Sequence, residues 1–288
     1  MHTARSRPIP ISSAALTVLA IAVSASPGVA QTASPNARGV SMGHLHYIVA
    51  DVAAERDFWV ALGGSARETG EGERVTMPGF VVELSAGDPE AGPALVDHAA
   101  FRVRSLAAIE SQGFELELVA AYPGIASVRS PAGNRIELFE EGTATNVGFA
   151  PDTADDVAER HNRPLVGALD SHHLHFYLPD DQVEPARDWY VEHFGAVPGV
   201  RWRYLAADLP GMNLNFSAAT GPQVPTRGRS LDHIGFEIVG LEAFCRELAS
   251  AGVVFDRPYR RISPALGVAT LTDPWGTTIE LSERPPEN

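Results

Sequence analysis

Four segments of this 288-residue chain follow one plan, and this repetition limits the folds that are open to it. Each segment begins with a short alternating stretch that carries a histidine, continues into a helical pattern, and closes with a proline–glycine turn and a strand. The opening stretches read GHLHYIVAD, DHAAFRV, HHLHFYLPD and DHIGFEIVG. The closing stretches read MPGFVVELS, SPAGNRIELFE, LPGMNLNFS and DPWGTTIELSE. The sequence therefore predicts four copies of one module that contains both helix and strands.

The ends of the helical patterns support this division into modules. Each pattern runs into a glycine, the residue that most often ends a helix, at Gly63, Gly113, Gly195 and Gly252. Asp51 and Ser105 stand where two of the helices would begin, and both residue types cap helix N-termini. A polar stretch with little periodicity separates the second copy from the third. We therefore expect an N-terminal domain of two modules at 42–142, a linker at 143–169 and a C-terminal domain of two modules at 170–284.

The polar residues of the modules recur at fixed positions. Each closing strand carries a polar residue four positions after its turn glycine, and each opening strand carries one histidine at the same register. The polar residues are Glu83, Glu137, Asn215 and Glu280, and the histidines are His44, His98, His173 and His233. Because side chains alternate along a strand, these residues face away from the apolar side that packs under the helix. A half-solvated sheet is one interpretation. Convergence of imidazole and carboxylate groups in a cupped sheet, where they bind a divalent metal, is the other.

Composition excludes several classes of function. The formal net charge is −14 and the pI is about 5.1, which argues against nucleic acid as a partner because that partner requires a basic patch. All 22 basic residues are arginine, so lysine-based Schiff-base chemistry and a P-loop lysine are absent. Cys245 is the single cysteine, which rules out an intramolecular disulfide and a cysteine-based zinc site. Nucleic-acid binding, lysine-based catalysis and cysteine-bound zinc are therefore not expected.

The N-terminus has the pattern of a secretory signal peptide. Arg5 and Arg7 precede an apolar run from about Ala14 to Val23, and small residues near Ala30 offer a cleavage site. The run is short for a membrane span. We therefore expect residues 1–30 to be a signal peptide and the mature protein to be periplasmic or secreted, with no membrane attachment after cleavage.

These residues and turns resemble the vicinal oxygen chelate superfamily, which includes glyoxalase I, extradiol dioxygenases and the bleomycin resistance proteins. The resemblance rests on the opening "DH" or "GH", the helix with its terminal glycine, and the closing PWGTTIEL and AGNRIEL. It implies an α+β fold in which four βαβββ modules pair into two cupped mixed β-sheets with helices on the outer faces. It also implies metal ligands on the first and last strands of paired modules.

The resemblance implies a ligand set for each half of the chain. The C-terminal half offers His173, His233 and Glu280, which is similar to the two-histidine, one-carboxylate set of the extradiol dioxygenases. The N-terminal half offers His44, Glu83, His98 and Glu137, which is closer to the four ligands of glyoxalase I. His175 and His46 stand two residues beyond ligand histidines on the same face, as candidate acid–base groups or as residues that only line the cavity.

Two classes of function follow from this resemblance. The first is an exported, metal-dependent enzyme that holds a small oxygenated metabolite through two neighbouring oxygens, with ring-cleaving dioxygenase chemistry or lyase and isomerase chemistry. Zn, Mn, Fe and Ni are all compatible with the ligand set, and the chain would be a monomer or a homodimer. The second is a non-catalytic protein that sequesters a small molecule, as resistance proteins do. Stoichiometric metal in the purified protein would separate the two classes.

Overall fold

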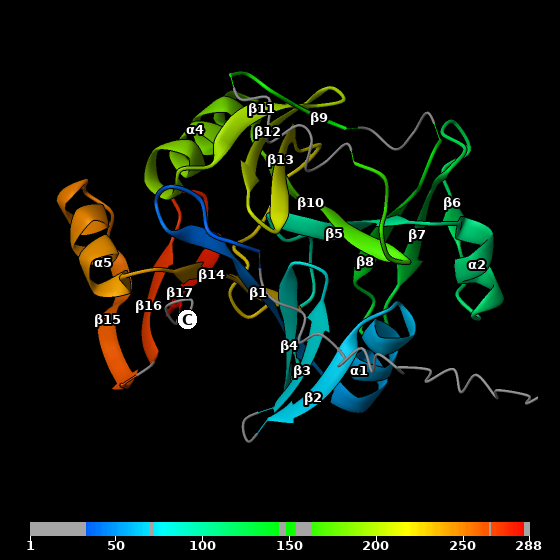
Figure 1. Ribbon diagram of the computed structural model, residues 1–288, viewed down its shortest axis with the longest axis horizontal. Helices are drawn as coiled ribbons and strands as arrows, with labels where there is room; N and C mark the ends of the chain where they lie inside the picture. The colour runs from blue at the N-terminus through cyan, green and yellow to red at the C-terminus, as the bar shows by residue number, and fades with distance from the viewer. Residues whose placement is uncertain (1–32, 70–71, 144–147, 154–162, 265, 285–288) are drawn as a thin grey trace, which may run out of the picture.

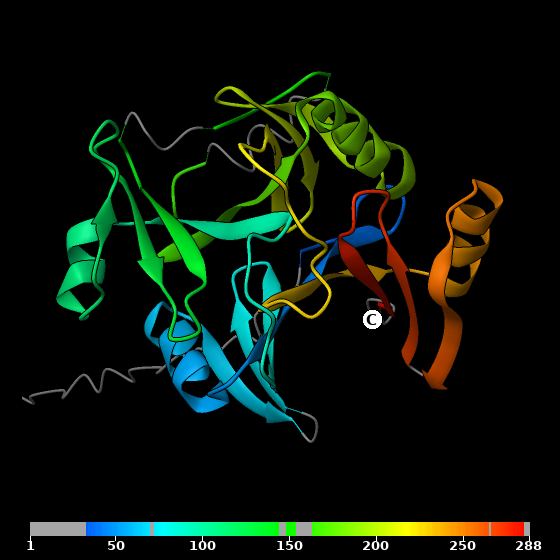
Figure 2. The same cartoon turned by 180° about the vertical axis from the view of Figure 1, so that it is seen from behind.

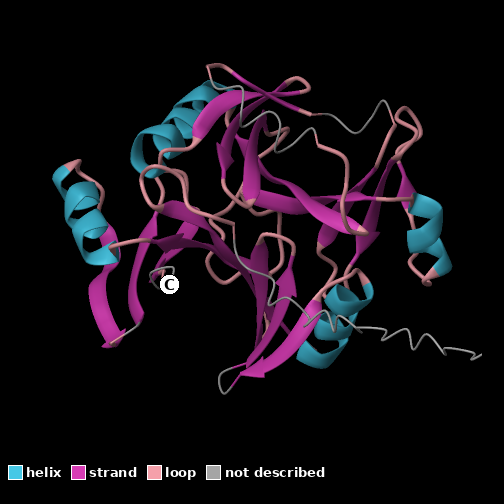
Figure 3. Cartoon of the chain, viewed as in Figure 1, coloured by secondary structure: helices cyan, strands magenta, loops and turns pink. Residues whose placement is uncertain are grey.

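The four predicted modules form two mixed β-sheets with helices at the periphery (Figures 1 and 3). The computed structural model describes residues 33–69, 72–143, 148–153, 163–264 and 266–284. The α+β class and the pairing of modules into two cupped sheets are confirmed. The predicted signal peptide, residues 1–30, lies outside the described residues. None of the helices in the described ranges has the length and apolar character needed to cross a bilayer.

The first sheet has eight strands and the second has nine. In spatial order, the strands of the first sheet are β15 (Phe255–Ser263), β16 (Leu266–Thr272), β17 (Thr278–Glu283), β14 (Leu231–Ile238), β1 (Val40–Val49), β4 (Phe80–Ala86), β3 (Gly72–Met77) and β2 (Ser65–Thr69). Those of the second are β6 (Glu117–Leu118), β7 (Ile125–Arg129), β8 (Arg135–Glu140), β5 (Val96–Val103), β10 (Leu169–Leu178), β13 (Met212–Ala218), β12 (Tyr204–Leu209), β11 (Val197–Arg201) and β9 (Phe149–Pro151). In each sheet the opening strands of two modules meet at the centre and run antiparallel.

The modules that share a sheet are not consecutive, so our expectation that each half of the chain builds its own cup is wrong. Strand β1 of the first module pairs with β14 of the fourth, and β5 of the second pairs with β10 of the third. In Figures 1 and 2 the blue N-terminal strand accordingly adjoins the gold and red C-terminal strands. The segment between β4 and β5 carries the chain from one sheet to the other. It is held there by backbone hydrogen bonds to the segment before β14, from Glu90 to Gly228 and from Leu95 to Val224.

The helices begin and end where the sequence predicts. They are α1 (Val52–Ala61), α2 (Leu106–Ser111), α4 (Val183–Phe194), which follows the short 3-10 turn η1 (Asp180–Gln182), and α5 (Leu241–Ser250). The Asp51 and Ser105 side chains accept hydrogen bonds from the backbone N–H groups of Ala54 and Ala108, so both caps are confirmed. Gly195 ends α4 in the left-handed conformation, with φ of 66°.

The apolar face of each opening strand packs against helices, as the alternation predicts. Leu45 and Tyr47 of β1 are buried, and the Tyr47 ring lies 5.7 Å from that of Trp59 on α1. Trp59 also contacts Phe101 of β5 at 6.1 Å, so one core joins the two sheets. The histidine-bearing faces are therefore left to form the two concave surfaces.

The predicted linker, 143–169, contains one strand that the sequence did not reveal. Its described residues include β9, which pairs antiparallel with β11 at the edge of the second sheet. An edge strand offers unpaired backbone groups, and a passing segment of three residues can pair with them without an apolar pattern of its own.

Candidate metal centres and cavity

Each concave sheet surface carries one group of histidines and acidic side chains. The first-sheet cluster consists of His44 and His46 on β1, Glu83 on β4, His233 on β14 and Glu280 on β17. The second-sheet cluster consists of His98 on β5, Glu137 on β8, His173 and His175 on β10, and Asn215 on β13. Each cluster thus draws its residues from the opening and closing strands of two modules, because the modules meet through their opening strands.

The structure regroups the predicted ligands. His173 lies in a different sheet from His233 and Glu280, so the predicted C-terminal triad does not form. The predicted N-terminal set is divided in the same way, because His44 and Glu83 belong to one sheet and His98 and Glu137 to the other. Each predicted ligand lies on a histidine-bearing concave face, but its partners follow the pairing of the modules.

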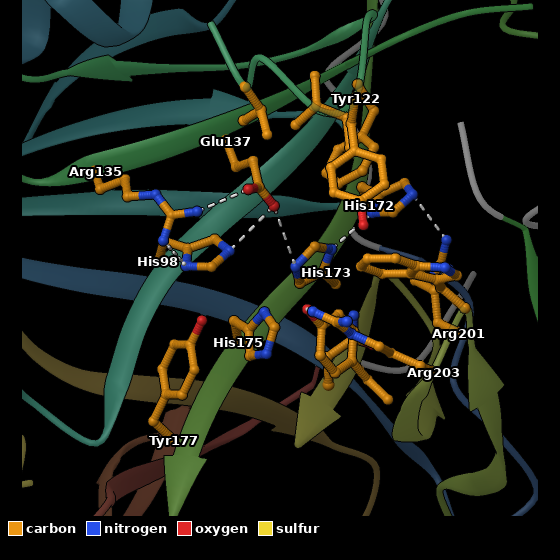
Figure 4. Close-up of a pocket in the computed structure, with 16 residues that line it drawn as sticks. His98, Tyr122, Arg135, Glu137, His172, His173, His175, Tyr177, Arg201 and Arg203 are labelled. Atoms are coloured by element: carbon orange, nitrogen blue, oxygen red, sulfur yellow. Dashed lines mark hydrogen bonds and ion pairs between the residues drawn. The ribbon is translucent and has the colours of Figure 1, made fainter. Parts of the chain in front are cut away.

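The second-sheet cluster converges on the Glu137 carboxylate (Figure 4). Glu137 Oε2 lies 3.3 Å from Nε2 of His98 and 3.9 Å from Nε2 of His173. Arg135 holds the other oxygen, Oε1, at 2.7 Å. Potential ligand atoms of His98, His173 and His175 also lie within 4.8 Å of one another. One divalent ion could therefore be reached by Glu137 and at least two histidines.

The orientation of His98 suits a metal ligand. Its Nδ1 atom lies 2.7 Å from Oδ2 of Asp97, so the Nδ1–H group donates to this carboxylate and the lone pair of the neutral ring is on Nε2. That lone pair faces the Glu137 oxygen at 3.3 Å. Two acceptors at this distance repel one another unless a proton or a cation lies between them.

Three buried polar atoms of the second-sheet cluster have no hydrogen-bond partner. They are Nε2 of His98, Nε2 of His173 and Oδ1 of Asn215. Buried polar atoms are normally paired, so unpaired atoms on three adjacent strands, β5, β10 and β13, indicate a missing ligand. The donor set of imidazole, carboxylate and amide oxygen fits a divalent cation.

His173 is held by a chain of hydrogen bonds that the sequence analysis did not identify. Arg201 Nη1 donates to Nε2 of His172 at 2.9 Å, and Nδ1 of His172 lies 2.7 Å from Nδ1 of His173. Because arginine is always a donor, neutral His172 donates from Nδ1 to His173, and neutral His173 carries its proton on Nε2. A metal ion at His173 would have to displace that proton. The signal in the sequence was the HHLH run, in which we assigned no role to His172.

The first-sheet cluster repeats this geometry with two glutamates, Glu83 and Glu280, in place of one. His233 Nδ1 lies 2.7 Å from Oδ1 of Asp232, which leaves Nε2 available, and Nε2 of His44 is buried without a partner. Potential ligand atoms of His44, His233 and Glu280 lie within 4.8 Å of one another. Glu83 is turned toward Arg74, at 2.5 Å, so the structure brings it near the cluster without placing it among these three.

Burial controls the charges of the buried histidines. It lowers the pKa of His44 to about 3, and it lowers that of His175 to about 3 with help from the neighbouring His98. Burial and the nearby His172 also lower the pKa of His173 well below its ordinary value. Neutral imidazole is the form that binds metals and accepts protons, so His44 and His175 are ready for either role at neutral pH, whereas His173 must first lose its Nε2 proton.

The carboxylates of the two clusters differ in their pKa shifts. Burial disfavours the charged form of Glu137, but contact with His98 and the charge of Arg135 hold its pKa below the ordinary value. Burial likewise opposes ionisation of Glu83, but the His46 contact and the charges of His44 and Arg74 lower its pKa to about 2. Burial, with a contribution from Glu83, raises the pKa of Glu280. Two carboxylates that face one cluster in this way would be stabilised by a bound cation.

The two predicted acid–base histidines occupy equivalent places. His175 Nε2 lies 2.7 Å from the hydroxyl of Ser217, and His46 Nε2 lies 2.8 Å from the hydroxyl of Ser85. The His175 ring stacks on Tyr177 with centroids 4.7 Å apart. Both histidines therefore lie beside the predicted ligands, as expected, and a role in proton transfer stays a prediction.

A cavity of about 320 Å³ opens in front of the second-sheet cluster (Figure 4). Its floor contains His98, Glu137, His173, His175 and Asn215. Its lining also contains aromatic and arginine side chains that the sequence did not single out, and these are Tyr122, Arg135, Phe139, Tyr177, Arg201, Trp202, Arg203 and Tyr204. The RWRY run at 201–204 was a visible signal for several of them. The size suits a small molecule.

The comparisons with known proteins agree with the fold. Residues 172–281 match the family described as the glyoxalase/bleomycin resistance protein/dioxygenase superfamily. Glyoxalase I from Zea mays shares the fold with a TM-score of 0.58 and 16% identity, over 85% of this chain and 92% of that one. A putative dioxygenase from Bacillus subtilis has a TM-score of 0.57 and 17% identity, over 89% and 87%. The search of curated proteins returned no significant match.

Proposed function

Residues 172–281 belong to the glyoxalase/bleomycin resistance protein/dioxygenase superfamily, and 85% of the chain shares the fold of glyoxalase I. From this premise we propose that the protein is a divalent-metal-dependent enzyme. Its substrate is a small oxygenated molecule that occupies the cavity of the second sheet. One observation carries the proposal. Nε2 of His98 and Nε2 of His173 are buried without a hydrogen-bond partner, and they lie 3.3 and 3.9 Å from Oε2 of the Glu137 carboxylate.

His98, His173 and Glu137 would hold the ion. A bound divalent metal would supply Lewis acidity to two neighbouring oxygens of the substrate. Asp97 fixes the His98 ring and Arg135 fixes the Glu137 carboxylate, so two of the ligands are oriented before the ion arrives. Asn215 stands where the other three modules have glutamate, and its neutral amide is a weak ligand, which leaves room for the substrate.

The protein residues beside the ion would manage protons. His175 lies within the cavity next to His98, with ring centroids 5.0 Å apart, and its Nε2 is tied to the Ser217 hydroxyl. A neutral imidazole in this position can accept a proton from a bound substrate and return it later. Tyr177 stacks on the His175 ring and keeps its plane fixed.

The ligand set favours one type of reaction over another. Two histidines and one carboxylate with open positions form the set of non-haem iron oxygenases, so ring cleavage with O₂ is the reaction that the second-sheet cluster supports best. The first-sheet cluster is the basis for a second candidate. It adds a second carboxylate, Glu83, near His44, His233 and Glu280, which is closer to an isomerase or lyase of the glyoxalase I type. Zn, Mn, Fe and Ni all fit these donors.

Metal analysis of purified variants tests the proposal. We expect wild-type protein to contain stoichiometric metal, Glu137→Gln to lose the ion of the second sheet, and Glu280→Gln to lose that of the first. Glu117→Gln, an exposed strand position paired with Arg129, is the control and should keep the wild-type content. Oxygen uptake with catechols and isomerase assays with hemithioacetals then separate the two reaction types. Metal-free wild-type protein that binds its ligand fully would instead support the sequestration alternative.

Export of the protein is part of the same proposal. A signal peptide at 1–30 would place the enzyme in the periplasm or outside the cell, where ferrous iron and glutathione are both scarce. Zinc or manganese is then the better candidate for the ion than iron, and of these two zinc does not activate O₂ by itself. Sequencing the N-terminus of protein from the exported fraction is the test, and we expect it to begin near Gln31. A chain that retains residues 1–30 and stays in the cytosol would refute this part and leave the metal chemistry untouched.

A further inference from the structure

We infer that the turn Trp202–Arg203 and the ring of Tyr122 form a binding subsite for a planar aromatic group that carries negative charge. The subsite lies at the rim of the second-sheet cavity. The subsite would define the substrate class of the proposed enzyme. Only the part of the substrate that binds the metal depends on the proposed function. The aromatic end depends on side chains that take no part in metal binding.

The backbone of Trp202 is the first observation. Trp202 and Arg203 are the two turn residues between β11 and β12, since Arg201 pairs with Tyr204. Trp202 has φ of 57° and is the only non-glycine residue with positive φ in the described ranges. A two-residue hairpin usually gives such a position to glycine, asparagine or aspartate. Strain of this kind persists mainly where function requires the side chain.

The exposure of the side chain is the second observation. The Trp202 side chain is large and apolar, yet the residue is 44% exposed. Tyr122, which comes from the loop before β7 in another module, is 37% exposed and meets the Trp202 ring edge to face at 5.1 Å. Two exposed aromatic residues from different modules therefore form one side of the cavity rim.

The aromatic surface continues inward from this rim to the candidate metal centre. The ring centroids of Trp202 and Tyr204 are 5.5 Å apart, and those of Tyr204 and His175 are 4.8 Å apart. The apolar lining also includes Val119 and Ile125, which flank Tyr122. The aromatic ring of a ligand can lie along such a wall while oxygen atoms at the other end of the same ligand reach Glu137 and the histidines.

The charge of the subsite comes from Arg203. Its guanidinium lies 4.2 Å above the Trp202 ring and 5.4 Å from the Tyr204 ring. Its only hydrogen-bond partner in the described part of the chain is the Tyr204 hydroxyl, at 3.4 Å, and no carboxylate there pairs with it. A cation held flat on an aromatic ring at the rim is suited to a carboxylate or similar anion on the ligand.

Ligand binding to metal-free protein tests the subsite independently of the proposed reaction. The protein is Glu137→Gln treated with chelator, so the metal has no influence on the outcome. The probes are 3-phenylpropanoate, its neutral amide, and 3-cyclohexylpropanoate, measured by calorimetry and by quenching of tryptophan fluorescence. We expect the aromatic anion to bind about 3- to 10-fold more tightly than either of the others.

Variants in the same background assign the effect to residues. Trp202→Gly should weaken both aromatic probes by about 10-fold. Arg203→Gln should weaken the two anions by about 5-fold and leave the amide unchanged. Trp189→Phe and Arg246→Gln, on helices α4 and α5, are the matched controls and should bind like the parent.

Two results would overturn the inference. One is equal affinity of the parent for all three probes, or affinities that Trp202→Gly and Arg203→Gln do not change. The other is a thermal midpoint of Trp202→Gly more than about 5 °C below the parent with unchanged probe affinity, which would make the residue structural. The metal content and the enzyme activity of the variants in the metal analysis test the proposed function alone, and neither result affects this inference.

Discussion

A single methyl group on Gly235 should disable the first-sheet cluster. Gly235 of β14 lies directly across from His44 of β1 in the antiparallel pair. A Cβ atom at Gly235 would stand 2.1 Å from Cε1, 2.2 Å from Nδ1 and 2.6 Å from Nε2 of the His44 ring. The His44 ring is buried, so the space into which it can retreat is small.

The size of the effect follows from these distances. To reach a carbon–carbon contact of about 3.5 Å, the ring must move by more than about 1 Å. Metal ligands have to be placed within about 0.5 Å. We therefore expect Gly235→Ala to weaken metal binding at the first sheet by about 10- to 100-fold, the range seen when the support of a ligand is lost. Overpacking should lower the free energy of unfolding by about 1–3 kcal/mol.

Zinc titration against a competing chelator measures this effect, in a Glu137→Gln background that disables the second-sheet cluster. Urea unfolding of the same protein gives the change in stability. Ala100→Gly is the matched control, because Ala100 lies across from His173 in the second sheet, where a methyl group is already accommodated. If Gly235→Ala keeps the parental zinc affinity while His44→Ala loses it, the position of the His44 ring is not what the metal requires, and the reasoning fails.

Three further predictions concern other residues. Asn215→Asp should tighten metal binding by the second-sheet cluster and lower the thermal midpoint of the metal-free protein, because it adds a buried negative charge to that cluster. Calorimetry would show an unchanged metal affinity and an unchanged thermal midpoint if Asn215 did not face the ion. The folded-state pKa of His175 is lowered to about 3 from an unfolded value near 6.5, so its stabilising contribution is complete above about pH 6.5 and declines as pH falls toward 3. The free energy of unfolding in urea should therefore depend less on pH in His175→Gln than in the wild type across that range. The same dependence on pH in both proteins would contradict the lowered pKa. Tyr190→Phe should lower the free energy of unfolding by about 1–2 kcal/mol, because the Tyr190 hydroxyl donates to the buried Asp273 carboxylate at 2.9 Å; no change in urea midpoint would show that this bond contributes nothing net.

The face of the strand on which each residue lies and the limits of the helices were predictable, because both depend on short-range patterns. The alternation in DHIGFEIV places His233 on one face and Ile234 on the other whatever the strand pairs with. Asp51 caps α1 through a contact three residues away, and such a contact needs no tertiary structure. The module, its helix limits and the set of polar residues on its concave face therefore follow from the sequence.

The partners of each module were not predictable, because all four opening strands offer a similar edge. Either neighbour would bury the same apolar face, so the pattern of β1 does not distinguish β5 from β14. The choice depends on where the chain between β4 and β5 lies, and that depends on long-range contacts such as the hydrogen bond from Leu95 to Val224. Only the tertiary structure therefore decides that His173 joins His98 and Glu137, while His233 and Glu280 join His44. The aromatic rim was hidden for the same reason, since Tyr122 and Trp202 are 80 positions apart in the sequence and meet only when the second and third modules pair.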